Sequence, residues 1–271
     1  MKAAIKLFLI FILLQLLGSL AAVPLVLMYQ FVVTGTVDAD AAGAQTLVPG
    51  SLLTLFFTVW YLWKKGYLAD DGQLYSPVSG AYLGWTALMG VGAIVWLEAL
   101  AGVLDFLPNW LETSFDRILS SWAGMLYIAL LGPVLEELVF RGAITRELLR
   151  KFRPGMAIFI SGLLFGLIHF NPVQSVFGFL AGMLLAWLYW RTRSVVPCIV
   201  VHVLNNALSV GCTLAYPDVD TVADLMGYPA YGICLGVGAV ALGVGLWQLL
   251  RRPKAPDYDR PYVEPLNVEK P

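Results

Sequence analysis

The sequence predicts an all-α protein, a polytopic bundle of about eight transmembrane helices. Hydrophobic residues make up 59% of the 271 residues, charged residues make up 13%, and the mean hydropathy is +0.77. This composition lies outside the usual range of soluble domains. Eight apolar segments are nearly long enough to cross a hydrocarbon core of about 30 Å, which takes roughly 20 helical residues. The expected spans are 7–33, 47–63, 81–104, 118–140, 156–170, 173–190, 194–215 and 228–250.

The distribution of basic residues orients this bundle. Lys and Arg in short loops are retained on the cytoplasmic side of a membrane. In an eight-span arrangement the basic clusters all fall on one side, and they are Lys2 and Lys6, Lys64 and Lys65, Arg146, Arg150, Lys151 and Arg153, Arg191 and Arg193, and Arg251, Arg252 and Lys254. The opposite loops are acidic, with Arg117 as their only basic residue. We therefore expect both termini in the cytoplasm and the protein in a bacterial inner (plasma) membrane.

The ends of the chain differ in character. The first span has a small-residue stretch, GSLAAV, like that of a signal peptide, but its apolar run is too long for one, so we expect a retained helix. Residues 1–252 are expected to form a single transmembrane domain. Residues 253–271 contain five prolines and mixed charge, and they are expected to be a disordered cytoplasmic tail. With a net charge of −1 and no long basic run, the chain is not expected to bind nucleic acid.

The two histidines of the chain both lie inside expected spans. His169 ends the fifth span in the segment FGLIH, and His202 lies in the seventh in the segment HVLNN. An ionisable side chain in a transmembrane helix is costly, so it usually faces the bundle interior and marks a pathway or a site. Either histidine alone can be explained as a hydrogen-bonding contact between helices. The two together predict a functional site.

The fourth span carries three charges in the segment LLGPVLEELVFRG, residues 130–142. Glu137 and Arg141 are four residues apart and can pair on one helix face. This ion pair is either the main role of Glu137 or an addition to a catalytic role. Glu136 points about 100° away from Glu137 and has no such partner. An unpaired carboxyl in an apolar medium is poised to act as an acid or a base, so Glu136 is the stronger catalytic candidate.

Helix geometry predicts where these side chains meet. At a rise of about 1.5 Å per residue, Glu136, His202 and Asn206 lie at one depth. His169 lies roughly 24 Å inward from the basic boundary, beside the turn that follows it. Either this hairpin is sunk in the bundle or its first helix begins outside the core. Pro133, one turn before Glu136, is either a packing kink or the cause of a freed carbonyl near the site.

Three motifs follow one another on separate expected helices: Glu136-Glu137-x-x-x-Arg141, Phe165-x-x-x-His169 and His202-x-x-x-Asn206. Their order and spacing resemble the CAAX prenyl protease type II and bacteriocin-processing family of intramembrane proteases, called CPBP or Abi. The resemblance covers residues 118–210, which are the expected protease core of the transmembrane domain. Each motif alone is weak, whereas the three in this order are specific.

This resemblance implies hydrolysis of a peptide bond in a membrane cavity. The residues matching Glu136 and His169 are held to activate a water molecule, and those matching His202 and Asn206 to stabilise the oxyanion. Glu137 is expected to belong to the same catalytic set.

Two further roles are expected around this set. Arg141 and Phe165 are expected to support the site. Glu136, His169 and His202 also make a zinc set with an open position, although zinc and metal-free schemes use the same side chains.

The expected partner is a membrane-associated or lipidated peptide or protein within the lipid bilayer. The alternative function is a non-catalytic membrane immunity or scaffold protein of the same fold. A proton or small-solute transporter is a third class, because buried ionisable residues also form relays. Cys198, four residues before His202, is either a thiolate nucleophile or a small apolar filler.

Overall fold

The computed structural model describes residues 1–69, 73–104, 106–219 and 221–253. The expected disordered tail lies outside the described residues from position 254 onward and stays a prediction. The described chain is helical and has no strand, although Tyr75 and Ser194 form an isolated antiparallel bridge. The predicted all-α fold class is therefore confirmed.

The elements in chain order are α1 (Lys2–Thr34), α2 (Ala39–Gln45), α3 (Leu47–Lys64), α4 (Gly80–Val103), α5 (Glu112–Leu119), α6 (Trp122–Leu126), the π-helical turn η1 (Tyr127–Leu131), α7 (Gly132–Val139), the π-helical turn η2 (Phe140–Thr145), α8 (Arg146–Leu149), α9 (Pro154–Leu167), α10 (Pro172–Thr192), α11 (Val196–Ala215), α12 (Val222–Met226) and α13 (Tyr228–Leu250).

In the described part of the chain, 7 helical segments are long and apolar enough to cross a membrane. They correspond to all the expected spans except the fifth, which is the apolar helix α9 of 14 residues. A helix of this length measures about 21 Å, less than the roughly 30 Å of a hydrocarbon core. The chain is thus an integral membrane protein in which one of the eight expected spans is a shorter helix.

The fourth span is one continuous helical segment, Trp122–Leu149, which contains α6, η1, α7, η2 and α8. Its bounds differ from the expected 118–140 at both ends. It begins later because the Ser121 side chain accepts the backbone N–H of Gly124 and caps a new helix after α5. It continues past Arg141 because that guanidinium is paired inside the protein and does not end the apolar segment.

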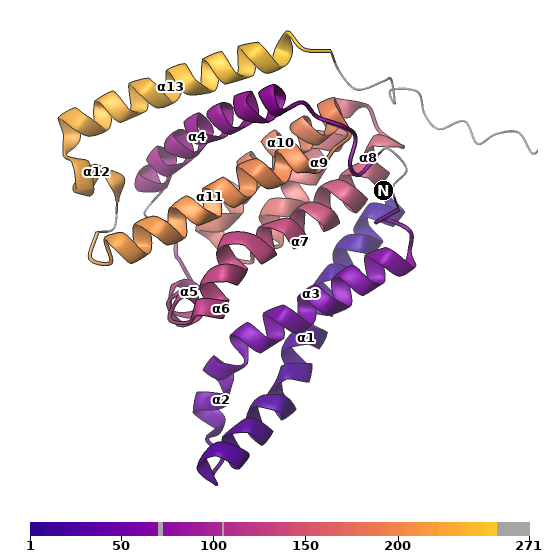
Figure 1. The fold of residues 1–271 in the computed structure, drawn as a ribbon, viewed down its shortest axis with the longest axis vertical. Helices are drawn as coiled ribbons and strands as arrows, with labels where there is room; N and C mark the ends of the chain where they lie inside the picture. Colours follow the sequence, from indigo (N-terminus) through magenta and orange to yellow (C-terminus); the bar gives the residue numbers. More distant parts are fainter. Residues whose placement is uncertain (70–72, 105, 220, 254–271) are drawn as a thin grey trace, which may run out of the picture.

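The axes of the long helices are roughly aligned, and several of the helices form close pairs (Figure 1). α1 packs on α3, α4 on α13, and α9 on α10. α7 contacts α3 and α11, and α11 in turn contacts α4 and α10. The α1–α3 pair extends beyond the other helices, with α2 near its far end (Figure 1).

The N-terminus and the C-terminal ends of α3, α8 and α13 lie toward the same end of the helices in Figure 1. The expected basic clusters occur at these ends, among them Lys64, Arg150 and Arg251. This is the arrangement that a chain with both ends on one side requires. The side of the membrane itself stays a prediction.

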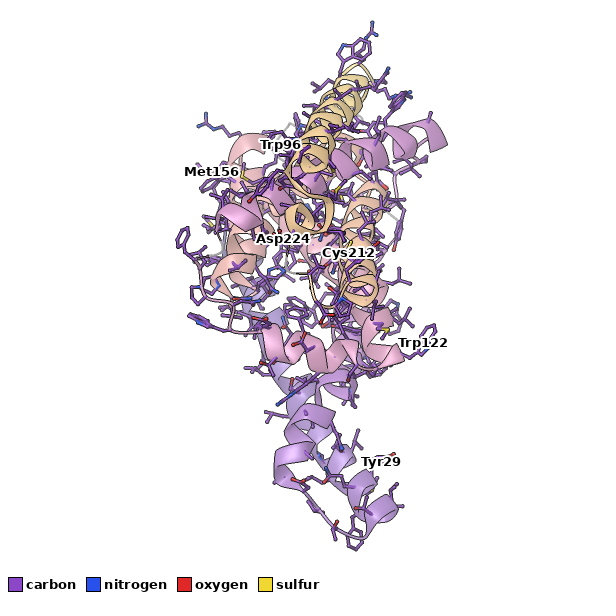
Figure 2. All side chains as sticks on the ribbon, turned by 90° about the vertical axis from the view of Figure 1, so that its left-hand side faces the viewer. Tyr29, Trp96, Trp122, Met156, Cys212 and Asp224 are labelled. Carbon is purple, nitrogen blue, oxygen red and sulfur yellow. The ribbon has the colours of Figure 1, made fainter. Side chains whose placement is uncertain are left out.

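Large apolar side chains cover the outside of the bundle. Tyr29, Trp96 and Trp122 are 63%, 45% and 83% exposed. Figure 2 shows Tyr29 toward the far end of the α1–α3 pair and Trp122 at the margin of the bundle. An exposed surface of this kind suits contact with lipid, and large outward-facing side chains need no partner within the protein.

Glycines let α9 and α10 approach each other closely. A Cβ atom on Gly178 would lie 3.1 Å from the Cα of Gly166, and one on Gly182 would lie 3.0 Å from the Cα of Gly162. Small residues at such contacts allow two backbones to pack in a membrane. Gly178 and Gly182 are four residues apart, so they lie on the same face of α10.

The turn between α9 and α10 is partly buried, with Phe170 62% exposed and the next residue covered by another loop. Phe170 adopts a left-handed conformation, with φ 48°, which reverses the chain after His169. The next residue, Asn171, is 1% exposed. Its side chain donates to Asn109 Oδ1 at 2.8 Å and accepts the backbone N–H of Trp110 at 3.3 Å. The loop before α5 therefore covers the hairpin, which favours the sunken of the two arrangements left open by the sequence.

Candidate active site

Four elements of the core carry or adjoin the predicted site residues. α7 carries the two glutamates, and the π-helical turn η2 that follows it carries Arg141. Phe165 lies on the last turn of α9, and His169 directly follows that helix. α11 carries His202 and Asn206. Because α7 contacts α11 and α9 contacts η2, these side chains are brought into one region.

The predicted ion pair between Glu137 and Arg141 is present and fully buried. Arg141 Nη1 lies 2.6 Å from Glu137 Oε1, and both side chains are 0% exposed. Arg141 Nη2 also donates to the carbonyl oxygen of Gly182 at 3.1 Å. The guanidinium carbon lies 4.4 Å from the centre of the Phe165 ring. The embedded arginine thus has a carboxylate, a carbonyl and an aromatic face as partners, which offsets part of its desolvation.

Glu137 has a second partner, which lies on another helix. The Nδ1 atom of His202 lies 2.8 Å from Glu137 Oε1. Because a carboxylate accepts hydrogen bonds, this contact places a proton on Nδ1 and turns Nε2 toward the site. Glu137 therefore does more than neutralise Arg141, since it also fixes the orientation of an imidazole. The catalytic role expected for Glu137 stays a prediction.

Glu136 differs from its neighbour in both exposure and partners. Its side chain is 28% exposed, whereas that of Glu137 is buried. Among the described residues, its one contact with a charged or chargeable side chain is that of Oε2 with His202 Nε2, at 3.8 Å. This distance is too long for a hydrogen bond and is one that a shared water molecule can bridge. Glu136 is thus the carboxylate of the site that remains free to hold a water.

Phe165 separates the two histidines. Its ring centre lies 5.2 Å from that of His169 and 5.5 Å from that of His202, and both contacts are edge-on. His169 Nδ1 also lies 2.8 Å from the carbonyl oxygen of Phe165. A carbonyl only accepts, so this contact places the proton on Nδ1 and leaves Nε2 of His169 available. Phe165 is 2% exposed and contacts both rings, and its supporting role stays a prediction.

Asn206 is held from both ends of its amide. Its Nδ2 atom donates to the carbonyl oxygen of Ile128 at 2.9 Å. Its Oδ1 atom accepts from Asn205 Nδ2 at 3.1 Å. Sequence reasoning did not identify Ile128 or Asn205 as part of the site. Pro133 was the sequence signal for Ile128. A proline one turn before Glu136 was expected either to be a packing kink or to free a backbone carbonyl near the site.

Glu136, His169 and His202, the expected zinc set, are not grouped closely enough to hold a metal ion. Among the described residues, no three His, Cys, Asp or Glu side chains lie close enough together to hold a metal ion. The ring orientations are nevertheless those of many metal-binding histidines, in which Nδ1 donates to a carboxylate or carbonyl and Nε2 is left for a ligand. His202 has the first kind of partner and His169 the second.

Cys198 is fully buried one turn before His202. Its Sγ atom lies 3.2 Å from the carbonyl oxygen of Leu185 and 3.8 Å from that of Ser194. Both contacts point the sulfur toward backbone carbonyls, which do not activate a thiol. The position favours the apolar filler of the two expectations for this cysteine.

The central part of the chain is similar to known membrane peptidases. Residues 118–208 match the family described as type II CAAX prenyl endopeptidase, Rce1-like. The putative membrane peptidase YdiL of Bacillus subtilis (strain 168) is 32% identical over 82 residues, which are 30% of this chain and 34% of that protein. The membrane-embedded CAAX protease MroQ of Staphylococcus aureus (strain USA300) is 33% identical over 101 residues, which are 34% of this chain and 40% of that protein.

These matches cover the site but not the whole molecule. All the predicted site residues, from Glu136 to Asn206, fall within the segment 118–208. The chain nevertheless spans well under half the length of both curated relatives. No solved structure gives a significant match.

Proposed function

Because this chain belongs to the Rce1-like type II CAAX prenyl endopeptidase family through residues 118–208, we propose that it is an intramembrane endopeptidase. Its substrate is a membrane-associated or lipidated peptide, and its nucleophile is a water molecule. One observation carries the proposal. A partly exposed carboxylate, Glu136, faces the Nε2 atom of His202, whose other nitrogen is held by the buried Glu137.

Glu136 is the general base in this mechanism. A base must lie within hydrogen-bond reach of the water that it deprotonates and must be free of a competing cation. The carboxylate of Glu136 is partly exposed, so a water molecule can reach it, and Arg141 is already bound to Glu137. His169, with Nε2 available, is the second group that orients the water. Attack forms the bond between the water oxygen and the carbonyl carbon, and Glu136 keeps the proton.

His202 and Asn206 act on the oxygen of the attacked carbonyl. An oxyanion is stabilised by donors that are already oriented before the reaction. In its protonated form His202 donates from Nδ1 to Glu137 and from Nε2 to the oxyanion, and the buried carboxylate stabilises the positive ring. Asn206 supplies the second N–H of its amide, because the first is bound to Ile128. The intermediate collapses when the C–N bond breaks and Glu136 returns its proton to the leaving nitrogen.

The decisive experiment compares peptide termini in membranes that contain the protein or its Glu136→Gln variant. We expect one or more new termini with the intact protein and none with the variant, because glutamine cannot accept the proton. Glu98→Gln is the matched control, since Glu98 is a partly buried carboxyl on the membrane helix α4, away from the site. Identical termini with the intact protein and Glu136→Gln would favour the non-catalytic immunity or scaffold alternative.

We also propose that the protein lies in a bacterial inner membrane with both termini in the cytoplasm. The support is the clustering of basic residues at one end of the helices and the bacterial origin of both relatives. Green fluorescent protein folds and fluoresces in the cytoplasm but not after export through the general secretion route. A fusion at the C-terminus should therefore fluoresce, and a dark fusion that is present at normal amounts would reject this orientation.

A further inference from the structure

The anchor of Asn206 is a carbonyl within the π-helical turn η1. In this turn the backbone N–H of Gly132 donates to the carbonyl of Tyr127, five residues earlier. The next carbonyl, that of Ile128, can be reached along the helix from position 132 in an α-helical bond or from position 133 in a π-helical bond. The N–H of Gly132 is directed to Tyr127. Position 133 is therefore the remaining source of a helical donor.

Position 133 is a proline and has no N–H group. The Ile128 carbonyl thus lacks the donor that the register of η1 would supply. A partly buried carbonyl without a donor is costly, especially where no bulk water is available. The Asn206 amide fills this place with a hydrogen bond of 2.9 Å from another helix.

We propose that Pro133 is a positioning residue for Asn206. By withholding an N–H from the Ile128 carbonyl, it leaves an acceptor on the catalytic helical segment that fixes one hydrogen of the Asn206 amide. The second hydrogen then has a defined direction, because the amide plane is also held through Oδ1 by Asn205. The catalytic consequence rests on the proposed function, in which this second hydrogen stabilises the oxyanion.

Gly132 supports the same arrangement. A Cβ atom at this position would lie 3.1 Å from the carbonyl oxygen of Tyr127 and 3.4 Å from its ring. A side chain would therefore push on the carbonyl that accepts the Gly132 N–H and would shift the register of η1. The pair Gly132 and Pro133 together maintain a π-helical turn with one free carbonyl.

Kinetics of peptide cleavage test the catalytic part. Pro133→Ala restores an N–H that competes with Asn206 for the Ile128 carbonyl. We expect kcat to fall by about tenfold or more while KM stays within about twofold, because removal of one oxyanion donor costs about 10²–10³ in kcat. Adding Asn206→Ala to Pro133→Ala should cost much less than Asn206→Ala alone, because both changes act on one interaction. Pro154→Ala, in the first turn of α9, is the control and should retain the normal kcat.

Thermal unfolding in detergent tests the hydrogen bond without requiring cleavage. Asn206→Ala should lower the Tm by about 2 °C with Pro133 present. In the Pro133→Ala background the same change should lower the Tm by less than half as much, because the restored backbone N–H takes over the carbonyl. Equal losses in the two backgrounds would overturn the proposal. Coupled losses in a protein that cleaves nothing would support the positioning role and reject only the protease function.

One comparison keeps the proposal testable if Pro133→Ala does not accumulate. Asn206→Leu leaves the Ile128 carbonyl without a donor, whereas Asn205→Leu removes the amide of an exposed neighbour. We expect the Asn206 variant to have the lower Tm. Equal Tm values for the two variants would overturn the proposal.

Discussion

The core around the candidate site and the α1–α3 pair are both built from apolar helices, but they are held together differently. In the core, comprising α7, η2, α9, α10 and α11, buried charged and polar side chains bond across helices, as Arg141 does with Gly182 and His202 with Glu137. In the α1–α3 pair, small residues bring the backbones together, with a Cβ on Gly50 reaching within 3.1 Å of the Cα of Ser19. Lipid-facing helices can thus associate through close packing, whereas buried charges in a membrane need partners on other helices.

The largest expected loss of stability follows from removing the buried cation of the core. Arg141→Met leaves Glu137 buried without its counter-ion, and removing one partner of a buried pair costs about 3–5 kcal/mol. We expect low accumulation, a strongly reduced Tm and no cleavage. Arg150→Met is the control, because the Arg150–Glu147 pair has a separation of 2.9 Å but a 43% exposed arginine. Such exposed pairs contribute about 0–1 kcal/mol, so similar Tm losses for both variants would contradict the contrast.

Substitutions of Glu136 and Glu137 should differ in their effects on activity and on stability. Glu136→Gln should lower kcat by about 10²–10⁴ because the general base is lost, with an almost unchanged Tm. Glu137→Gln should lower both kcat and Tm, because Glu137 pairs Arg141 and holds His202. Steady-state kinetics and thermal unfolding of the two variants measure this directly. A Glu136→Gln variant as unstable as Glu137→Gln would assign Glu136 a structural role instead.

The same glycine-to-alanine substitution should differ between the close contact of α9 with α10 and the open surface of α2. Gly182→Ala places a Cβ within 3.0 Å of both Gly162 and Phe165, and such overpacking costs about 1–3 kcal/mol. Gly43→Ala, in α2, meets nothing within 4 Å and should be neutral or slightly stabilising, because alanine favours helix. The free energies of unfolding of the two variants provide the test. The close approach of α9 and α10 would be in doubt if both were neutral.

The smallest expected difference concerns two buried threonines. The Thr145 hydroxyl in the core lies 2.6 Å from Ser161 Oγ and 2.7 Å from the carbonyl oxygen of Phe140. The Thr58 hydroxyl, on α3, is buried and has no hydrogen-bond partner among the described residues. Thr145→Val should cost about 1 kcal/mol, and Thr58→Val should be neutral or stabilising. Equal costs would remove the distinction between a polar core and an apolar pair of helices.

The local parts of the fold and the site could be predicted from spacing. Apolar length predicted the helices, and the four-residue spacing of Glu137 and Arg141 predicted their ion pair. The absence of such a partner for Glu136 identified the carboxylate that remains partly exposed. The bounds of the fourth span could not be predicted, because a charge ends an apolar pattern in the sequence even when it is paired inside the protein.

Contacts between distant segments were beyond sequence reasoning. Nothing local relates His202 to Glu137, which is 65 residues away, or Asn206 to Ile128, which is 78 residues away. The depth of His169 also depended on the loop that covers Asn171. The spacing within one motif did not predict that the site residues meet or what they do. That prediction came from the resemblance of the three motifs, taken together, to a family.

The sequence by itself determined that this is an integral membrane protein of helices, with charges that must face inward, because apolar length and the cost of a charge in lipid are properties of single segments. Only the tertiary structure decided which groups meet those charges. It assigned Glu137 to both Arg141 and His202, left Glu136 partly open, and gave the free Ile128 carbonyl to Asn206. The physical reason is that hydrogen bonds act over about 3 Å, so they depend on how helices far apart in the chain pack.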